Sequence, residues 1–143
     1  MNIPAQFSVN KTLSNSYLQT GLDPDNGTLL LTCLRSYVPA DVFRDTLTAI
    51  QEKLGRQEIK KMIFDKSELS VFDQDSMRWY HVEWKPVMFK KGLKHHRKIL
   101  PKDDFFRSSV QSGRKKIKNA YPEFNFEDYD IQYCQSVEEA IEK

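Results

Sequence analysis

The three histidines and two cysteines are the residues whose side chains most readily bind metals or act as nucleophiles. His95 and His96 are adjacent in a predicted strand, so their side chains should point to opposite faces of a sheet. His81 lies in a predicted helix with no histidine or cysteine three or four positions away. Cys33 and Cys134 stand far apart in apolar segments, which is typical of buried, reduced thiols. We therefore expect no metal site, no disulfide and no cofactor.

Motifs of enzymes that bind phosphate groups or hydrolyse esters and peptides do not occur in the sequence. The chain has five glycines, and no glycine-rich loop follows a predicted strand. It contains neither a nucleophile elbow nor an HExxH zinc motif. The neighbouring carboxylates Asp103 and Asp104 stand where a helix is expected to begin, and the helix dipole favours acidic residues there. The sequence therefore predicts a protein that is not an enzyme.

The positive charge of the chain is concentrated in residues 85–118. This segment holds twelve Lys and Arg against two Asp and Glu, whereas the rest holds ten basic and eighteen acidic residues. We expect a basic surface that attracts anions weakly, because reading a base sequence needs a recognition helix or stacking aromatic residues among the basic ones. Nucleic acid is therefore not the expected partner. The residues expected on this surface are Lys90, Lys91, Lys94, Arg97, Lys98, Arg114, Lys115, Lys116 and Lys118.

A predicted helix over residues 74–91 carries apolar side chains on two opposite faces. A helix on the surface of a domain needs one apolar stripe, so the second face must contact something other than the sheet. That contact is another part of the same domain, a second copy of the chain or an apolar ligand. Pro86 lacks the amide hydrogen that would bond to the Val82 carbonyl, so we expect a kink or the start of a new turn. The first face comprises Met77, Tyr80, Trp84, Val87 and Met88, and the second comprises Trp79, Val82, Pro86 and Phe89.

Turn residues and apolar periodicity predict an N-terminal hairpin followed by alternating helices and strands. Residues 23–27, Asp-Pro-Asp-Asn-Gly, are strong turn formers between strands over residues 17–22 and 28–34. Pro39 begins a helix that we expect to end at Gly55. Strands are then expected at residues 62–64, 96–100 and 131–134, and helices begin at Asp73 or Asp75, at Asp103 or Asp104, and at Ser136. This order predicts an α/β fold, a mostly parallel mixed sheet covered by about four helices.

Length and composition indicate one small domain. The chain has 143 residues, of which 39% are hydrophobic and 29% charged, as in ordinary globular domains. Residues 1–16 are rich in Asn and Ser and should be a frayed extension or an edge strand, with the domain itself over residues 17–143. The longest apolar run, residues 29–31, is far shorter than the ~18 residues of a membrane helix. Because the first residues also lack signal-peptide features, we expect a cytoplasmic protein without membrane insertion.

The chain resembles the STAS-like domains of the anti-sigma-factor-antagonist superfamily. Residues 27–32, the helix that contains Phe43, and residues 61–65 carry the resemblance. It is closest to small bacterial members without an assigned role, in which a tryptophan-containing helix follows the strand that ends in Asp and the last helix begins like residues 136–140. The resemblance implies a non-enzymatic protein–protein interaction module. Some members are switched by phosphorylation and others bind small ligands.

The phosphorylation switch of that family is an Asp-Ser pair at the start of the helix after the Asp-ending strand. The expected register of this chain places Asp73 and Gln74 there, and glutamine cannot be phosphorylated. Ser76 follows Asp75 two residues later, but Met77 replaces the usual glycine. We therefore expect Ser76 to be an ordinary first-turn residue rather than a phosphorylation site.

Three functional hypotheses follow from the sequence. The first is a STAS-like interaction module that pairs with another protein or with itself as a homodimer through the face of Trp79 and Phe89. The second is a domain that binds or senses a small apolar or lipid-like ligand between the same helix and the sheet. The third is a factor associated with anions or nucleic acid through residues 85–118.

Overall fold

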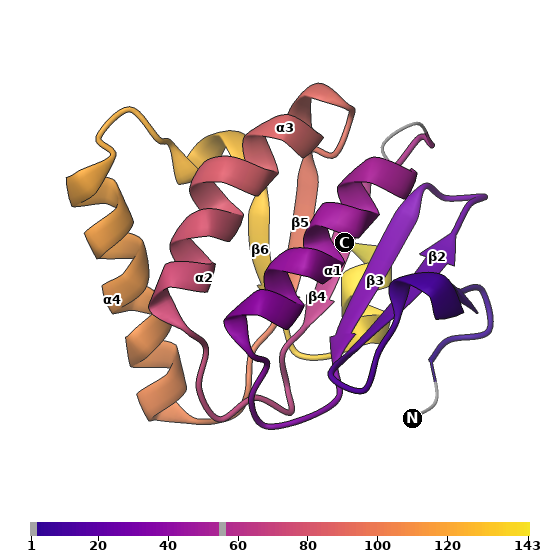
Figure 1. Ribbon diagram of the computed structural model, residues 1–143, viewed down its shortest axis with the longest axis horizontal. Coiled ribbons are helices and arrows are strands. Elements are labelled where there is room, and N and C mark those ends of the chain that lie inside the picture. Colours follow the sequence, from indigo (N-terminus) through magenta and orange to yellow (C-terminus); the bar gives the residue numbers. More distant parts are fainter. Residues whose placement is uncertain (1–2, 55–56) are drawn as a thin grey trace.

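A six-stranded mixed sheet forms the centre of the protein (Figure 1). The structure, a computed structural model, describes residues 3–54 and 57–143. The strands lie side by side in chain order. Neighbours among the first three strands are antiparallel, and the last four strands are parallel. This confirms the predicted α/β fold with its N-terminal hairpin. The strands are β1 (Ser8–Val9), β2 (Leu18–Asp23), β3 (Thr28–Cys33), β4 (Lys61–Asp65), β5 (His95–Ile99) and β6 (Ile131–Cys134).

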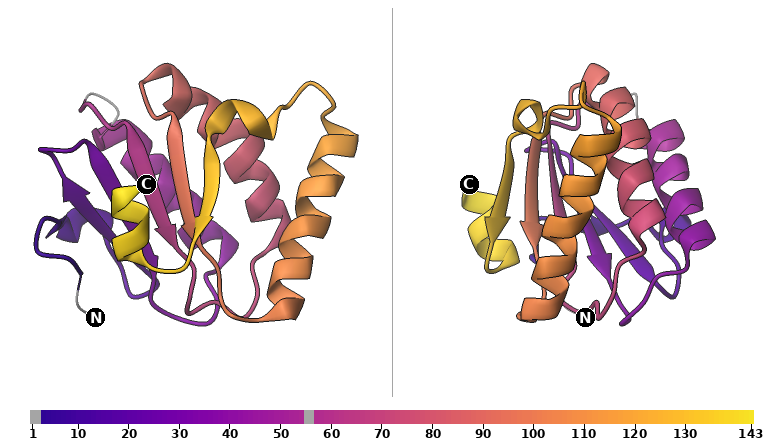
Figure 2. Two further views of the ribbon diagram at one scale, coloured as in Figure 1. Left: turned by 180° about the vertical axis from the view of Figure 1, so that it is seen from behind. Right: turned by 90° about the vertical axis from the view of Figure 1, so that its left-hand side faces the viewer.

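The helices that connect the parallel strands cover one face of the sheet, which we call the helix face (Figures 1 and 2). Neighbouring parallel strands joined by connections of the same hand place every connecting helix on the same side. The last helix, α5 (Val137–Glu142), lies on the opposite face, the back face (Figure 2). The elements on the helix face are α1 (Ala40–Leu54), α2 (Gln74–Trp79), η2 (Tyr80–Trp84), α3 (Lys85–Lys90) and α4 (Asp104–Ala120). The chain also forms two 3-10 turns, η1 (Lys11–Leu13) and η3 (Phe126–Tyr129).

Polar side chains cap three helices at residues that the sequence indicated. The side chain of Asp73 accepts a hydrogen bond from the Ser76 amide at the start of α2, and Asp103 caps α4. Ser136 caps α5 by accepting from the Glu139 amide. The predicted helix end at Gly55, like residues 1–2 of the predicted extension, lies outside the described residues. Within that extension, residues 8–9 form the edge strand β1.

The segment over residues 74–91 is not one continuous α-helix. A π-helical turn, η2, separates α2 from α3, and its closing bond runs from the Lys85 amide to the Tyr80 carbonyl. Pro86 follows in the first turn of α3, where a missing amide hydrogen is tolerated. The extra residue of a π turn rotates the helix that follows it. As a result Lys85 points into the interior, and Val87, which the sequence placed on the buried face, is 37% exposed.

Two apolar clusters fill the two sides of the sheet. The cluster on the helix face includes the mutually packed rings of Phe43, Phe64 and Tyr80. The smaller cluster on the back face lies under α5. Cys33 belongs to the first cluster and Cys134 to the second, and both are buried free thiols, as predicted. No helix in the described ranges has both the length and the apolar character needed to cross a membrane.

Candidate functional site

Four basic side chains are buried together between the helix face of the sheet and the segment η2–α3. His81 and Lys85 come from this segment, and His96 and Lys98 come from β5, where alternate residues face the helices. Lys85 is 0% and Lys98 3% exposed, and both histidines are equally buried. Lysine is rarely buried in this way without a charged partner. We call these four residues the buried cationic cluster.

The amino groups of the cluster lie close to one aromatic ring and one imidazole. Lys98 Nζ is 3.4 Å from His81 Nε2. The two lysine nitrogens, of Lys85 and Lys98, lie 5.0 and 5.2 Å from the centre of the Tyr80 ring. Both lysines are therefore held over the same ring, and an ammonium group is attracted to the face of such a ring.

No carboxylate neutralises the buried cationic cluster in the described part of the chain. The ion pairs there involve Lys60, Arg78, His95, Arg97 and Lys143, and none involves a cluster residue. Several nitrogens of the cluster also lack a hydrogen-bond partner among the residues that the structure describes. They are Lys85 Nζ, His81 Nδ1 and both ring nitrogens of His96.

Burial shifts the protonation of every member of the cluster. It lowers the pKa of Lys85 and of Lys98 well below the usual value of 10.5. The charge of Lys85 lowers the pKa of Lys98 further. Burial and the neighbouring lysines also lower the pKa of His81 and His96 well below 6.5, so both imidazoles are uncharged near neutral pH. The site therefore favours uncharged bases unless an anion compensates the charge.

A third lysine, Lys66, is buried near the cluster. Its Nζ lies 4.7 Å from the centre of the Phe64 ring and 4.6 Å from that of Phe72. Burial lowers the pKa of Lys66 to about 8. Its charge contributes to the lowered pKa values of Lys85 and Lys98.

Aromatic side chains from the segment after α4 cover the cluster. The Phe126 ring lies 5.0 Å from the His81 ring, and the Tyr129 ring lies 5.7 Å from Lys85 Nζ. Phe124 stacks on Tyr129 with ring centres 5.4 Å apart. The connection that includes η3 is therefore one wall of the site.

A surface groove lies next to the cluster, between α4 and the end of β6. Its cavity volume is about 270 Å³, and its lining includes Arg107, Arg114 and Tyr133. Tyr133 is paired with Lys98 in the sheet, so the two side chains leave neighbouring strands on the same face. Arg114 donates a hydrogen bond of 3.0 Å to the Tyr133 hydroxyl, and its guanidinium lies 4.4 Å from the centre of the Phe126 ring. The residues between groove and cluster are thus themselves basic and aromatic.

The close approach of α4 to α2 positions Arg114. A Cβ atom at Gly113 would lie 2.6 Å from Met77 Sδ and 2.7 Å from Gln74 Oε1. Because glycine has no Cβ, α4 packs tightly on α2 one residue before Arg114. The groove side of α4 is therefore held against the body of the domain.

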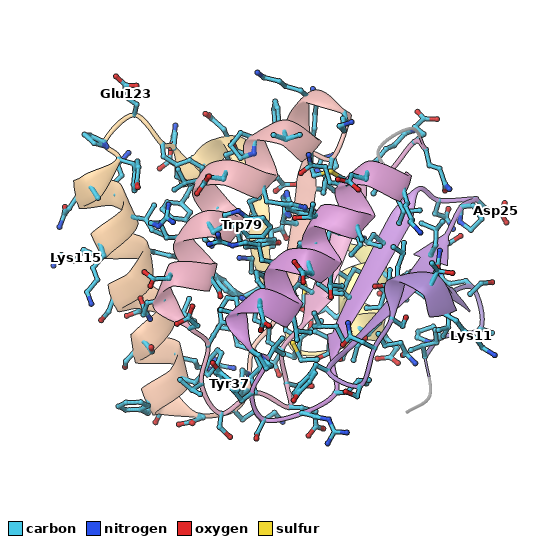
Figure 3. All side chains as sticks on the ribbon, in the orientation of Figure 1. Lys11, Asp25, Tyr37, Trp79, Lys115 and Glu123 are labelled. Carbon is cyan, nitrogen blue, oxygen red and sulfur yellow. The ribbon has the colours of Figure 1, made fainter. Side chains whose placement is uncertain are left out.

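The structure corrects part of the predicted basic surface. Arg97 and Lys98 are buried, because β5 lies inside the sheet and its two faces are both covered. Arg97 faces the back and donates to the Asp130 carboxylate at 3.1 Å and to the Lys143 carbonyl at 2.9 Å. Arg114 is half-buried at the groove. The six residues that do lie on the surface are Lys90, Lys91, Lys94, Lys115, Lys116 and Lys118, and Figure 3 shows Lys115 pointing outward from α4.

The residues of the second apolar face, Trp79, Val82, Pro86 and Phe89, are all half-buried. Trp79 lies between α2 and α1 (Figure 3), with its ring 6.1 Å from that of Phe43. The Phe89 ring lies 5.4 Å from that of Tyr129. The domain itself thus supplies contacts to this face, and its role as an interface or ligand surface stays a prediction.

The remaining residues singled out from the sequence occupy separate places. His95 is exposed and 2.6 Å from the Asp130 carboxylate, whereas His96 is buried, so the two point to opposite faces as predicted. Ser76 is buried in the first turn of α2, and its hydroxyl donates to Asp73 at 2.9 Å. Among the described residues, no group of three His, Cys, Asp or Glu side chains is placed to hold a metal ion.

The sequence did not indicate the buried cationic cluster. Two positions could have indicated it: Lys85 follows Trp84 on the buried side of the helical segment, and Lys98 alternates with Arg97 in a strand that must be covered on both faces.

Comparisons of the chain with protein-family models, with curated proteins and with solved structures found no match.

Proposed function

We propose that this protein is a non-enzymatic domain that binds a small anion through the buried cationic cluster. The observation that carries the proposal is that Lys85 and Lys98 are buried over one ring and form no ion pair with any carboxylate of the described residues. Burying a charged amine without a partner costs several kcal/mol, and replacing buried charges by apolar residues often stabilises a protein. Lysines in such positions oppose folding, which is typical of residues kept for function.

The chemistry of the cluster fits a phosphate or carboxylate ligand. Ammonium groups donate charge-assisted hydrogen bonds to these anions, and imidazole nitrogens add further donors. An anion also raises the pKa of the amine that it pairs with, which favours the protonated, charged form of that lysine. The unpartnered nitrogens of Lys85 and His96 would then acquire a partner.

We take the groove between α4 and β6 as the route from solvent, because Tyr133 in its lining is the sheet neighbour of Lys98. Its volume of about 270 Å³ is suited to a small metabolite rather than to a polymer. Arg107 and Arg114 give its lining a positive charge, which attracts anions. Movement of the Arg114 and Tyr133 side chains would open the way toward Lys98, its neighbour in the sheet. The sequence suggested anion binding by a basic surface over residues 85–118, whereas the proposal here assigns it to the buried cationic cluster.

Thermal unfolding in the presence of defined anions tests the proposal. A ligand that binds the folded state at 100 times its Kd stabilises it by about 2.7 kcal/mol. We expect inorganic phosphate or citrate to raise the Tm of the wild-type protein more than sodium chloride of equal ionic strength does. We expect Lys85→Met and Lys98→Met to lose most of this increase.

Lys115→Met is the matched control, because Lys115 is exposed on the outer side of α4. It should keep the full response to phosphate and citrate. If neither anion raises the Tm beyond the chloride effect, or if Lys98→Met responds as the wild-type protein does, the proposal is wrong.

A second candidate function is the interaction module implied by the resemblance, with a second copy of the chain as partner. The observation that favours it is the partial exposure of Trp79, Phe89 and Val87 along one helical segment. Aromatic residues are enriched in the centres of protein interfaces. This function is compatible with anion binding, because the two use opposite sides of the segment.

A further inference from the structure

We propose that Lys98 forms a reversible imine with an anionic carbonyl compound, a short 2-oxo acid or a carboxylated aldehyde. This deepens the proposed function, on which it rests, because the cluster would hold the anionic group of the same ligand. The geometry that carries it is the pair of amino groups of Lys85 and Lys98 over the Tyr80 ring, with His81 beside Lys98.

The two lysines are suited to different tasks. Only an uncharged amine is a nucleophile, and burial next to another cation is one way in which proteins keep a lysine uncharged. Lys98 meets both conditions, since it is buried and lies beside Lys85. Lys85 pairs with no carboxylate in residues 3–54 and 57–143, so its nitrogen can bind the carboxylate of a ligand.

His81 is placed to move the proton that this reaction releases. Its Nε2 lies 3.4 Å from Lys98 Nζ, close to the distance of a hydrogen bond. Burial, and then the charges of Lys85, Lys98, Lys66 and Arg114, lower the pKa of the imidazole, so it stays uncharged and passes on at once a proton that it accepts. Phe126 packs against the His81 ring and holds it in place.

The reaction balances without an oxidant or a reductant. The lone pair of Lys98 Nζ forms a bond to the carbonyl carbon while the C=O double bond becomes a single bond, and His81 carries one proton from the nitrogen to the oxygen to give a neutral carbinolamine. His81 then carries the second nitrogen proton to the hydroxyl group, the C–O bond breaks, and water leaves as the C=N bond forms. The products are the imine and one water molecule, and hydrolysis reverses the reaction.

The surroundings restrict the ligand to a small one. Lys98 is a sheet neighbour of Tyr133, which lines the groove of about 270 Å³. Aromatic side chains enclose the other sides of the cluster. Glyoxylate and pyruvate combine a carboxylate with a carbonyl group in two or three carbons, and they serve as probes.

Reductive trapping tests the inference on the folded, full-length chain. The protein is incubated with glyoxylate and sodium cyanoborohydride, and the modified lysines are located by mass spectrometry of peptides. Each pKa unit by which an amine is lowered increases its uncharged share about tenfold. We expect Lys98 to be modified at least about tenfold faster than the exposed Lys115, and excess phosphate to slow the modification of Lys98 alone.

Three variants complete the experiment. Lys115→Met should leave the Lys98 adduct unchanged, Lys98→Met should remove the fast adduct, and Lys85→Met should slow it by weakening the hold on the carboxylate. Modification of Lys98 no faster than that of Lys115 in the wild-type protein overturns the inference without any need for a variant. If phosphate raises the Tm but Lys98 is not trapped, the site binds anions and the imine is wrong. If Lys98 is not trapped and phosphate also fails to raise the Tm, both the imine and the proposed anion site are wrong.

Discussion

Among single residues, Lys98 is the clearest case of a buried side chain that stability alone would not favour. Its neighbours across the helix face, Phe64 on β4 and the ring of Tyr80, are aromatic. A methionine of similar length would fill this space without an amine that must lose its proton to be buried. The lysine is therefore expected to lower the stability of the ligand-free protein, and under the proposed function a bound anion recovers that loss.

The first prediction follows for Lys98→Met. Replacing buried ionic groups by apolar residues of similar volume stabilises proteins by about 2 kcal/mol in favourable cases. We expect Lys98→Met to raise the free energy of unfolding by a similar amount in chloride buffer at pH 7, measured by urea denaturation. Lys115→Met should change it by less than about 0.5 kcal/mol. A marked loss of stability in Lys98→Met would show that the amine makes a favourable contact in the ligand-free protein.

The segment α2–η2–α3 shows, at the scale of elements, how a single π turn builds the site. The turn brings His81 and Lys85 to the buried side together with Tyr80 and Trp84. The Trp84 indole donates to the Leu47 carbonyl of α1 at 2.7 Å and holds the turn against its neighbour. Functional sites are frequent at π turns. The outer side of the same segment keeps Trp79 and Phe89 partly exposed.

The second prediction concerns self-association through this outer side. If it is the interface, Phe89→Ala should be folded and monomeric in light scattering at concentrations where the wild-type protein is a dimer. The fold should survive because Phe89 is half-buried and contacts a surface connection through Tyr129. Phe105→Ala is the matched control, since Phe105 is 78% exposed on α4. Equal masses for the wild-type protein and Phe89→Ala would count against the homodimer.

The third prediction addresses the contact of Trp79 with its own domain. Its ring packs edge-on against Phe43 and lies 5.2 Å from the Arg44 guanidinium. Truncation of a buried Trp costs about 3–5 kcal/mol, and a half-buried one less. We expect Trp79→Ala to lower the free energy of unfolding by about 2 kcal/mol, measured by urea denaturation of a monomeric sample. A stability equal to that of the wild-type protein would show that Trp79 is available for another partner.

The distribution of charge distinguishes the whole molecule from an ordinary small domain. The net charge is only +2, yet among the described residues three lysines and two histidines are buried against a single buried carboxylate, that of Asp23. For each buried base the pKa is lower in the folded than in the unfolded state. The unfolded chain therefore binds more protons between these two pKa values. Stability must rise with pH across that range.

The fourth prediction is a pH profile of that sign. In chloride buffer the free energy of unfolding should increase from pH 5.5 to pH 9.5, first through the histidines and then through the lysines. Lys66→Met should reduce, without abolishing, the increase above about pH 8, the pKa of Lys66, because Lys85 and Lys98 contribute to the same range. Saturating phosphate should flatten the profile, because it stabilises protonated lysines. A wild-type profile that is flat or falls over this range in chloride contradicts the lowered pKa values.

Much of the architecture was predictable from local signals. The signals that indicated these elements lie within a few neighbouring residues. They are the turn at residues 23–27, the helix caps Asp73, Asp103 and Ser136, and the short apolar segment of the strand at residues 131–134. Because these interactions span a few positions, their residue types are sufficient to indicate them. The alternation of elements then determined the mixed sheet.

The site, by contrast, depends on contacts between distant segments. Lys98 and His81 are seventeen residues apart, and Arg114 meets Tyr133 nineteen residues away. In the sequence Lys98 is one basic residue among many, and only its place on a strand covered on both faces makes it a buried amine. Whether a charge is solvated depends on what packs over it. The sequence by itself therefore determined the elements and the fold class, and the tertiary structure decided which of the basic residues are chemically unusual.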